Sequence, residues 1–251
     1  MIPVHDPTDP RLFDFVALRD GHSPDGAFIV EGLNPLAELL RSPYSVRAVL
    51  VAESKLPRVE PLLAGIDAPL YVGAMDLVRA TVGFNLHRGV VASATRLPDA
   101  EPLSLLEGAR RVAILEDLND VENLGNLFRS ARAFGVEAVL LDPRTADPLY
   151  RRCVRVSMGH VLHVPFARFM TWPEVLSDVR ACGFTVAALT PSGDVSIDDV
   201  RGDRVAWLLG AEGPGLTGRA MALADLRVRI PIAPDVDSLN VGTAAAIAFR
   251  Y

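Results

Sequence analysis

Lysine is almost absent from this chain of 251 residues: Lys55 is the only one, and every other basic residue except histidine is an arginine. The 31 acidic residues outnumber the 25 basic ones, which gives a formal net charge of −6. This balance excludes a globally basic nucleic-acid coat and a polybasic membrane-surface protein, although it leaves room for local basic patches. The excess of arginine fits phosphate recognition but also GC-rich codon usage, so it carries no functional conclusion.

Cysteine and metal-ligand patterns are also scarce. Cys153 and Cys182 are too few for a disulfide framework or a cysteine-based zinc site, and we expect both to be free thiols. The five histidines show no metal-ligand spacing, so we expect no metal. No apolar run reaches the roughly 18 residues that span a bilayer, and no signal-peptide pattern follows Met1. We therefore expect a soluble, cytoplasmic protein without a membrane partner.

What the chain does contain is an alternation of short apolar runs and helical patterns, which is typical of an α/β fold. In the first part, the patterns predict strands at Ala27–Glu31, Val46–Ala52, Leu70–Val72 and Gly89–Ala94, and helices at Pro35–Leu40, Pro57–Ala64 and Met75–Val82. The proline-containing segment that follows indicates a linker at residues 96–110. These observations predict a first domain at 1–95 and a second at 111–251.

The second part is predicted to hold a parallel sheet with helices on both faces, because several of its strands are continuous apolar runs. Its strands are predicted at Arg111–Glu116, Ala138–Leu141, Val161–Val164, Phe184–Leu189, Val205–Leu209 and Val228–Ile232. Its helices are predicted after Asn123 and at Asp147–Val156, Trp172–Ala181 and Val241–Tyr251.

Three of the loops that follow these strands stand out, and ligands of open parallel sheets bind at such places. They lie at residues 117–125, 210–215 and 233–240. The middle loop is rich in glycine but lacks the signatures of a P-loop and of a dinucleotide-binding turn. Asn123 and Ser238 are residue types that cap helices, and capping explains them as well as a site does. Asn240 has no such helical explanation.

Together the three loops closely resemble the three motifs of the SpoU, or TrmH-type, class of the SPOUT methyltransferases. The first resemblance runs from Asn123 through Gly125 to Arg129, the second covers Leu209–Leu216, and the third joins Arg229–Ile232 to Ser238–Val241. Each motif is weak alone, but their order and spacing together are specific. The segment Ser157–His160 is similar to the family's Ser-x-Gly segment.

The resemblance implies a C-terminal SPOUT α/β domain with a deep trefoil knot, although base rates run against knots. The segments Phe28–Gly32 and His87–Ala92 resemble a preceding RNA-binding domain similar to ribosomal protein L30e. The implied cofactor is S-adenosylmethionine, and the implied reaction methylates a ribose 2′-hydroxyl of RNA. We expect rRNA rather than tRNA as the substrate and a homodimer as the assembly.

The same resemblance assigns the site residues one by one. It implies catalytic roles for Arg129, Asn123, Glu212, Ser238 and Asn240, and cofactor contacts for Gly210, Ile230, Leu239, Leu189 and Thr190. A free arginine is a very poor base, because its pKa lies above ~12. We therefore expect Arg129 to stabilise the developing alkoxide and to clamp a phosphate. A glycine at 210 would let the adenine edge approach the main chain.

RNA contacts are expected from Arg88, Arg151, Arg152 and Arg155, although any single one can be an ordinary surface charge. The chain departs from the family pattern at Val121, where proline is frequent, and at Asn126 and Arg88. The last predicted helix, which ends at Tyr251, is shorter than the resemblance leads us to expect.

Two other functions stay open. One is a catalytically inactive RNA-binding relative with the same fold, and the joint presence of the motif residues argues against it. The other is an unrelated α/β enzyme that binds a different nucleotide at its glycine-rich loops. The missing nucleotide-binding signatures count against that reading.

Overall fold

A computed structural model describes residues 1–19, 26–84, 86 and 88–251 of the chain, so His87 lies outside the described residues. The chain forms two compact units. Unit 1 comprises Met1–Leu97 and Leu149–Leu162, and unit 2 comprises Pro98–Pro148 and His163–Tyr251. The segment 149–162, which the sequence analysis places in the second domain, therefore belongs to unit 1.

Unit 1 is built on a mixed sheet in the order β1-β4-β3-β5-β2. The strands are β1 (Ile2–Pro3), β2 (Ala27–Glu31), β3 (Val46–Ala52), β4 (Leu70–Gly73) and β5 (Val90–Thr95). The helices are α1 (Phe13–Arg19), α2 (Leu33–Leu39), α3 (Leu56–Val59), α4 (Met75–Val82) and α6 (Arg151–Val156), with 3-10 turns at Pro10–Leu12, Glu53–Lys55 and Glu60–Leu63. The parallel pairs are β1 with β4 and β4 with β3, and β5 runs antiparallel to its neighbours.

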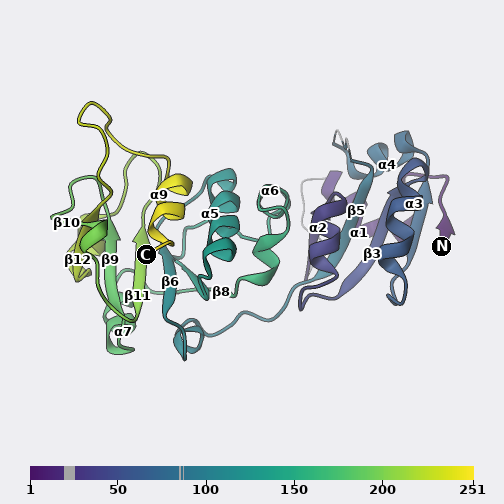
Figure 1. The fold of residues 1–251 in the computed structure, drawn as a ribbon. Coiled ribbons are helices and arrows are strands. Elements are labelled where there is room, and N and C mark those ends of the chain that lie inside the picture. The colour runs from purple at the N-terminus through teal and green to yellow at the C-terminus, as the bar shows by residue number, and fades with distance from the viewer. Residues whose placement is uncertain (20–25, 85, 87) are drawn as a thin grey trace. The chain divides into compact units, whose positions relative to one another are not determined.

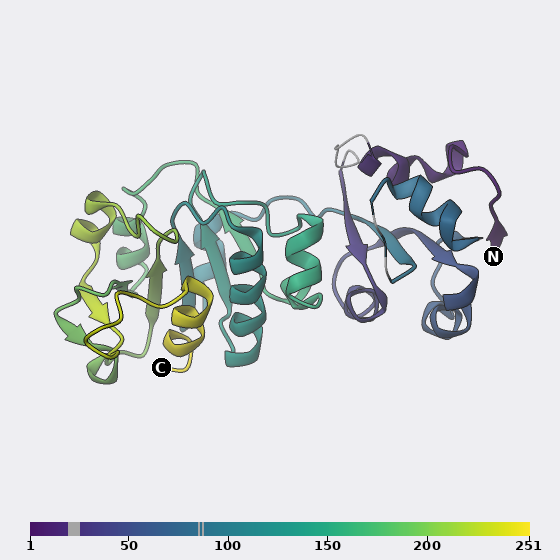
Figure 2. The same ribbon diagram turned by 90° about the horizontal axis from the view of Figure 1, so that it is seen from above.

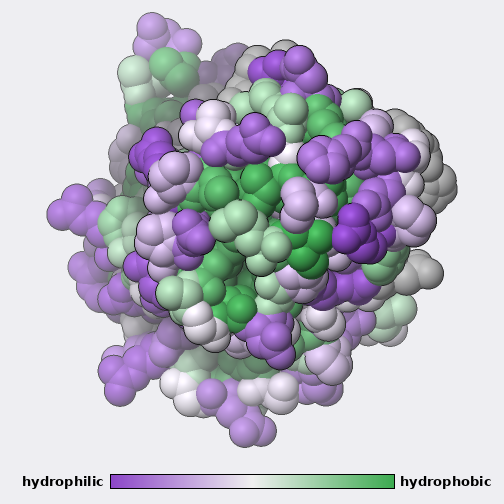
Figure 3. All heavy atoms as spheres, turned by 90° about the vertical axis from the view of Figure 1, so that its right-hand side faces the viewer, coloured by the Kyte–Doolittle hydropathy of each residue, from purple (hydrophilic) through white to green (hydrophobic). Residues whose placement is uncertain are grey.

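The core of unit 1 lies between this sheet and the helices α1 and α4. Leu50 and Val91 of the sheet are fully buried and pack in one cluster with Phe15 and Val82 of the helices. Large apolar side chains are also exposed on this unit, among them Phe13, Leu62 and Ile66. Figure 3 shows one face of the molecule on which apolar groups lie among polar ones. Scattered exposure of this kind is normal for protein surfaces.

Unit 2 holds a fully parallel sheet in the order β10-β12-β9-β11-β6-β7-β8. Its strands are β6 (Arg111–Leu115), β7 (Ala138–Leu141), β8 (Phe166–Arg168), β9 (Thr185–Leu189), β10 (Val195–Ser196), β11 (Val205–Leu209) and β12 (Leu226–Arg229). Its helices are α5 (Val121–Phe134), α7 (Leu176–Ala181), α8 (Gly218–Leu223) and α9 (Val241–Ala248), with 3-10 turns at Pro102–Leu106 and Ile197–Asp199. The predicted α/β class with a parallel sheet is confirmed (Figure 1).

Two features of unit 2 position the loops singled out in the sequence. The helices α5 and α9 lie side by side against the sheet, so the first and third motifs meet there (Figure 2). The strands β9 and β10 follow each other in the sequence, but β12, which comes later, lies between them in the sheet and pairs with both. The carboxyl end of β12 therefore lies beside the loop that connects β9 to β10.

The predicted strand at Val161–Val164 is wrong. A 3-10 turn occupies His160–His163, and the strand β8 begins only at Phe166. Before the turn, Met158 and Gly159 both have positive φ values, of 57° and 87°. This tight reversal directs the apolar side chains of Val161 and Leu162 into buried positions without a sheet. Their β propensity is therefore overridden by the local backbone.

Candidate functional site

The carboxyl ends of β9, β11 and β12 surround one cavity of about 340 Å³. Apolar side chains and irregular backbone both contribute to its wall. All five predicted cofactor residues line it: Leu189, Thr190, Gly210, Ile230 and Leu239. Three of the five predicted catalytic residues line it as well: Glu212, Ser238 and Asn240. The structure therefore brings the second and third motifs together around a volume typical of small-ligand sites.

A chain of hydrogen bonds connects all three motifs at the edge of this cavity. The side-chain amide of Asn123 donates from Nδ2 to Oε2 of Glu212 over 2.6 Å. The amide of Asn240 in turn donates from Nδ2 to Oδ1 of Asn123 over 2.7 Å. Asn123 is buried, whereas Glu212 and Asn240 are exposed. Asn123, which belongs to the first motif, thus donates to the second motif and accepts from the third.

Asn123 is free for this role because it does not cap a helix. The helix α5 begins at Val121, two residues before Asn123, and its cap is Asp120. The Asp120 carboxylate accepts from the backbone N–H groups of Glu122 and Asn123. The expected start of this helix after Asn123 is therefore wrong, because the aspartate that precedes it satisfies the first-turn donors.

The cap of α9 is also different from the expected one. Asn240, not Ser238, caps this helix, and its Oδ1 accepts from the N–H groups of Gly242 and Thr243. The same side chain donates to Asn123 from its Nδ2 atom. Asn240 therefore has a helical role that the sequence pattern did not reveal, and this role fixes the amide that faces α5.

Gly210 is required by the packing of its own loop. A Cβ at this position would lie 2.4 Å from the carbonyl carbon of Gly215 and from the backbone nitrogen of Leu216. The loop folds back on itself here, and the N–H of Gly215 donates to the carbonyl of Ala211. Steric exclusion inside the loop therefore requires glycine here, and the expected approach of an adenine edge to this main chain stays a prediction.

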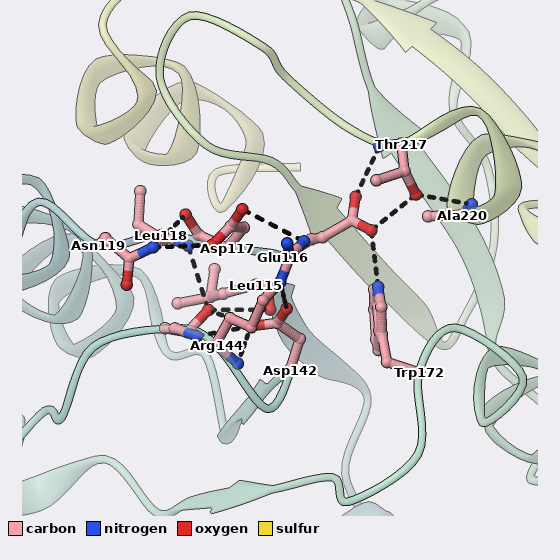
Figure 4. Close-up of polar contacts among 11 residues, drawn as sticks. Leu115, Glu116, Asp117, Leu118, Asn119, Asp142, Arg144, Trp172, Thr217 and Ala220 are labelled. Carbon is pink, nitrogen blue, oxygen red and sulfur yellow. Dashed lines mark hydrogen bonds and ion pairs between the residues drawn. The ribbon is translucent and has the colours of Figure 1, made fainter.

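Glu116 anchors the segment that follows the glycine-rich loop, residues 210–215. The sequence analysis did not identify this residue. It follows β6 and is fully buried. Its carboxylate accepts from the indole N–H of Trp172 over 2.6 Å, and from the backbone N–H and the hydroxyl of Thr217, each over 2.8 Å (Figure 4). Thr217 lies two residues after the end of the glycine-rich loop and caps α8. The only sequence signal was an acidic residue at the end of an apolar strand.

A second buried carboxylate secures the loop that leads into α5. Asp142 is fully buried after β7, and its Oδ1 accepts from the backbone N–H and the hydroxyl of Thr145. The Thr145 hydroxyl oxygen accepts from the N–H of Leu118, and Arg144 pairs with Asp117 at 3.2 Å (Figure 4). The approach to Asn123 is thus tied to the neighbouring strand β7.

Arg129 stands apart from the cavity. It is exposed on α5 and does not line the cavity wall. Within the described ranges, no hydrogen bond or ion pair of its side chain is recorded. The chain therefore leaves this guanidinium available to a group from outside.

The four arginines expected to contact RNA lie in unit 1. Arg151 and Arg155 both pair with Oε2 of Glu31, at 3.1 and 3.4 Å, and Glu31 is only 3% exposed. Arg151 also stacks over the ring of Phe84 at 3.8 Å. Arg152 and Arg88 are exposed. Arg151 and Arg155 are therefore engaged in ion pairs within unit 1.

The described part of the chain presents neither a cluster of metal ligands nor a membrane-spanning helix. No group of three or more histidine, cysteine or acidic side chains there is arranged to hold a metal ion. No helix among those residues is both long and apolar enough to cross a bilayer. Cys153 is buried and Cys182 partly buried, and neither forms a disulfide bond.

Comparison with known proteins adds independent information. The chain matches the model of the SpoU rRNA Methylase family over residues 110–250. It is 45% identical to an uncharacterized tRNA/rRNA methyltransferase of Mycobacterium tuberculosis, over 98% of this chain and 89% of the relative. It is 28% identical to the 23S rRNA (guanosine(2553)-2′-O)-methyltransferase of Bacillus subtilis, over 88% of this chain and 86% of that protein.

The fold is shared with solved structures. An AdoMet-bound rRNA methyltransferase from Sinorhizobium meliloti is 25% identical and superposes with a TM-score of 0.80, over 98% of this chain and 95% of that one. The family match covers more than half of the chain, and the relative from Mycobacterium tuberculosis aligns with nearly all of it. The chain therefore belongs to the SpoU rRNA Methylase family.

Proposed function

We propose that this chain is an S-adenosylmethionine-dependent methyltransferase that methylates a ribose 2′-hydroxyl of rRNA. The observation that carries the proposal is the hydrogen-bond chain from Glu212 through Asn123 to Asn240. It joins three motifs, far apart in sequence, beside the cavity that holds every predicted cofactor residue.

The residues of the cavity fit the proposed cofactor. The apolar side chains of Leu189, Ile230 and Leu239 can enclose an adenosine, and the irregular backbone beside them offers hydrogen-bonding groups. When bound, S-adenosylmethionine supplies a methyl group that its sulfonium already activates. AdoMet is the ligand named for the solved relative from Sinorhizobium meliloti.

The chain's own task is then to position a hydroxyl and to stabilise the charge it develops. Arg129 is the proposed group for this step, because it is exposed and holds a permanent positive charge. Asn123, Asn240 and Glu212 hold the motifs in register, and Ser238 is proposed to orient the site from the cavity wall.

A homodimer is proposed because Arg129 does not line the cavity of its own chain. A second chain would allow the arginine and the cavity to act together. We also propose that unit 2 is knotted, and the position of β12 between β9 and β10 supports this. Unit 1 is proposed as the L30e-like RNA-binding domain. An enzyme of rRNA works where ribosomes are made, so a cytoplasmic location is proposed.

Calorimetric titration with S-adenosylmethionine and S-adenosylhomocysteine tests the proposal, followed by transfer of a labelled methyl group to rRNA. We expect saturable binding near one site per chain and label in the ribose 2′-O position. Binding of RNA without binding of either ligand would contradict the proposal and favour the inactive RNA-binding relative. Label on a base would contradict the 2′-O assignment while leaving the methyltransferase in place.

A further inference from the structure

A second cavity, of about 360 Å³, lies within unit 1 and is not part of the site described above. Three cationic side chains line it: Lys55, Arg58 and Arg88. No acidic residue is among the described residues of its wall, and no ion pair or hydrogen bond of these three side chains is recorded there. Cations that converge without a counter-charge repel one another, so the arrangement favours an anionic ligand.

Two glycines leave room for the side-chain stems of Arg88 and Lys55. Gly32 has a φ of +100°, and a Cβ there would lie 2.9 Å from Cδ of Arg88. Gly89 has a φ of +65°, and a Cβ there would lie 3.2 Å from Cγ of Lys55. The stem of Arg88 therefore occupies space that glycine leaves open at position 32. The stem of Lys55 packs beside Gly89, where a Cβ would first meet Cε of Met75 at 2.7 Å. Packing of the backbone thus positions the stems of both cations at the cavity wall.

Met158 also lines this cavity, and it belongs to the Ser-x-Gly segment, residues 157–160. Its φ is 57°, in the left-handed region where a helix end normally carries glycine. Methionine at such a position is strained, and strain of this kind gathers at functional sites. The proposed methyl transfer assigns no role to the Ser-x-Gly segment. Through Met158, this segment supplies an apolar, polarizable side chain to a cationic cavity.

We infer that this cavity binds one unstacked nucleotide of an RNA strand. The guanidinium and ammonium groups hold its phosphates, and Met158, which is partly exposed, offers the base an apolar contact. The inference rests on the proposed RNA substrate and adds where, outside the methyl-transfer site, the strand is held. A free nucleotide would present the same chemistry, so the test separates the two.

The experiment measures binding of a labelled single-stranded RNA of ten nucleotides to the full chain by fluorescence anisotropy at several salt concentrations. The variants Lys55→Gln, Arg58→Gln and Arg88→Gln are each expected to bind about tenfold more weakly, with a salt slope smaller by about one. The matched control is Arg11→Gln, which removes one charge from an exposed side chain of unit 1 outside the cavity. It is expected to change affinity less than twofold.

The variant Met158→Gly separates a nucleotide site from a purely electrostatic patch. Glycine relieves the backbone strain, so the variant is expected to fold at least as stably as the unaltered chain. We expect it to bind the RNA about fivefold more weakly with an unchanged salt slope, because an uncharged contact is lost. Affinity equal to that of the unaltered chain would overturn the base-binding part of the inference.

The remaining outcomes also decide the inference. Cavity variants that behave like Arg11→Gln, or an unaltered chain that does not bind the RNA, would overturn it. Stronger binding of adenosine monophosphate than of the RNA would show a free-nucleotide site instead. Binding of S-adenosylhomocysteine is measured on the same samples and is expected to be unchanged. If the unaltered chain does not bind S-adenosylhomocysteine, the proposed function is contradicted. The RNA-binding measurements would then still decide whether the cavity binds RNA.

Discussion

At the scale of single residues, Asn123 holds the site together because an amide carries a donor and an acceptor at once. It donates to Glu212 and accepts from Asn240. Asn123→Asp removes the donor and places a carboxylate against Glu212, so the two groups repel. We expect the affinity for S-adenosylhomocysteine to fall about tenfold, which corresponds to about 1.4 kcal/mol, as measured by calorimetry.

The polarity of this contact can be reversed to test the same point. Adding Glu212→Gln to Asn123→Asp restores a donor facing an acceptor, and we expect most of the affinity to return. Asn126→Asp is the matched control, because Asn126 is exposed on the same helix and the charge change is identical. An Asn123→Asp variant that binds the ligand as well as this control would show that the contact does not organise the cavity.

Arg129 supplies the second prediction at this scale. Arg129→Ala is expected to lower methyl transfer to rRNA by at least 100-fold and to leave S-adenosylhomocysteine affinity within several-fold, because this residue does not line the cavity. The measurement pairs single-turnover transfer with calorimetry. Arg132→Ala, also exposed and on the same helix, is the control. Equal activity of the two variants would remove Arg129 from the proposed mechanism.

At the scale of elements, the support of the glycine-rich loop by Glu116 gives a third prediction. Glu116→Gln places an amide among three donors, and a buried unpaired donor costs roughly 1–3 kcal/mol. We expect a lower free energy of unfolding in urea and weaker binding of S-adenosylhomocysteine. Trp172→Phe removes one donor and keeps the carboxylate with Thr217, so we expect a smaller loss of affinity. The reverse order of the two variants would contradict the prediction.

The elements also show where reading the sequence succeeds and where it fails. The apolar runs at Ala138–Leu141 and Val205–Leu209 are strands with the predicted bounds, because buried parallel strands carry continuous apolar side chains. The run at Val161–Val164 is equally apolar but forms a 3-10 turn. Its side chains are buried against other segments, and burial alone does not distinguish a strand from a turn.

At the scale of the whole molecule, a segment from the second half of the sequence completes the first unit. Glu31 is 3% exposed and pairs with Arg151 and Arg155, 120 residues or more further along the chain. Replacing both arginines by glutamine leaves a buried carboxylate without its cations. We expect the free energy of unfolding in urea to fall by about 2–3 kcal/mol, below the range for fully buried pairs because both guanidinium groups are partly exposed.

The companion variant for this prediction is Glu31→Gln in the same background. It removes the uncompensated charge, and we expect it to recover a large part of the lost stability. A double arginine variant as stable as the unaltered chain would show that these ion pairs contribute nothing to unit 1. Equal stability with and without Glu31→Gln would show that the carboxylate is not the source of the loss.

The sequence by itself determined the α/β class and most strand positions, because strand periodicity is a local property of the chain. The residues of the cavity were named from the sequence only through its resemblance to the SpoU methyltransferases. Only the tertiary structure decided that Asp120 and Asn240 cap the two helices, which releases Asn123 to join the motifs. It alone placed the segment 149–162 with the first unit and brought Met158 to a cationic cavity. Those pairings join residues far apart in sequence, and no local pattern records which distant partner satisfies a buried charge or amide.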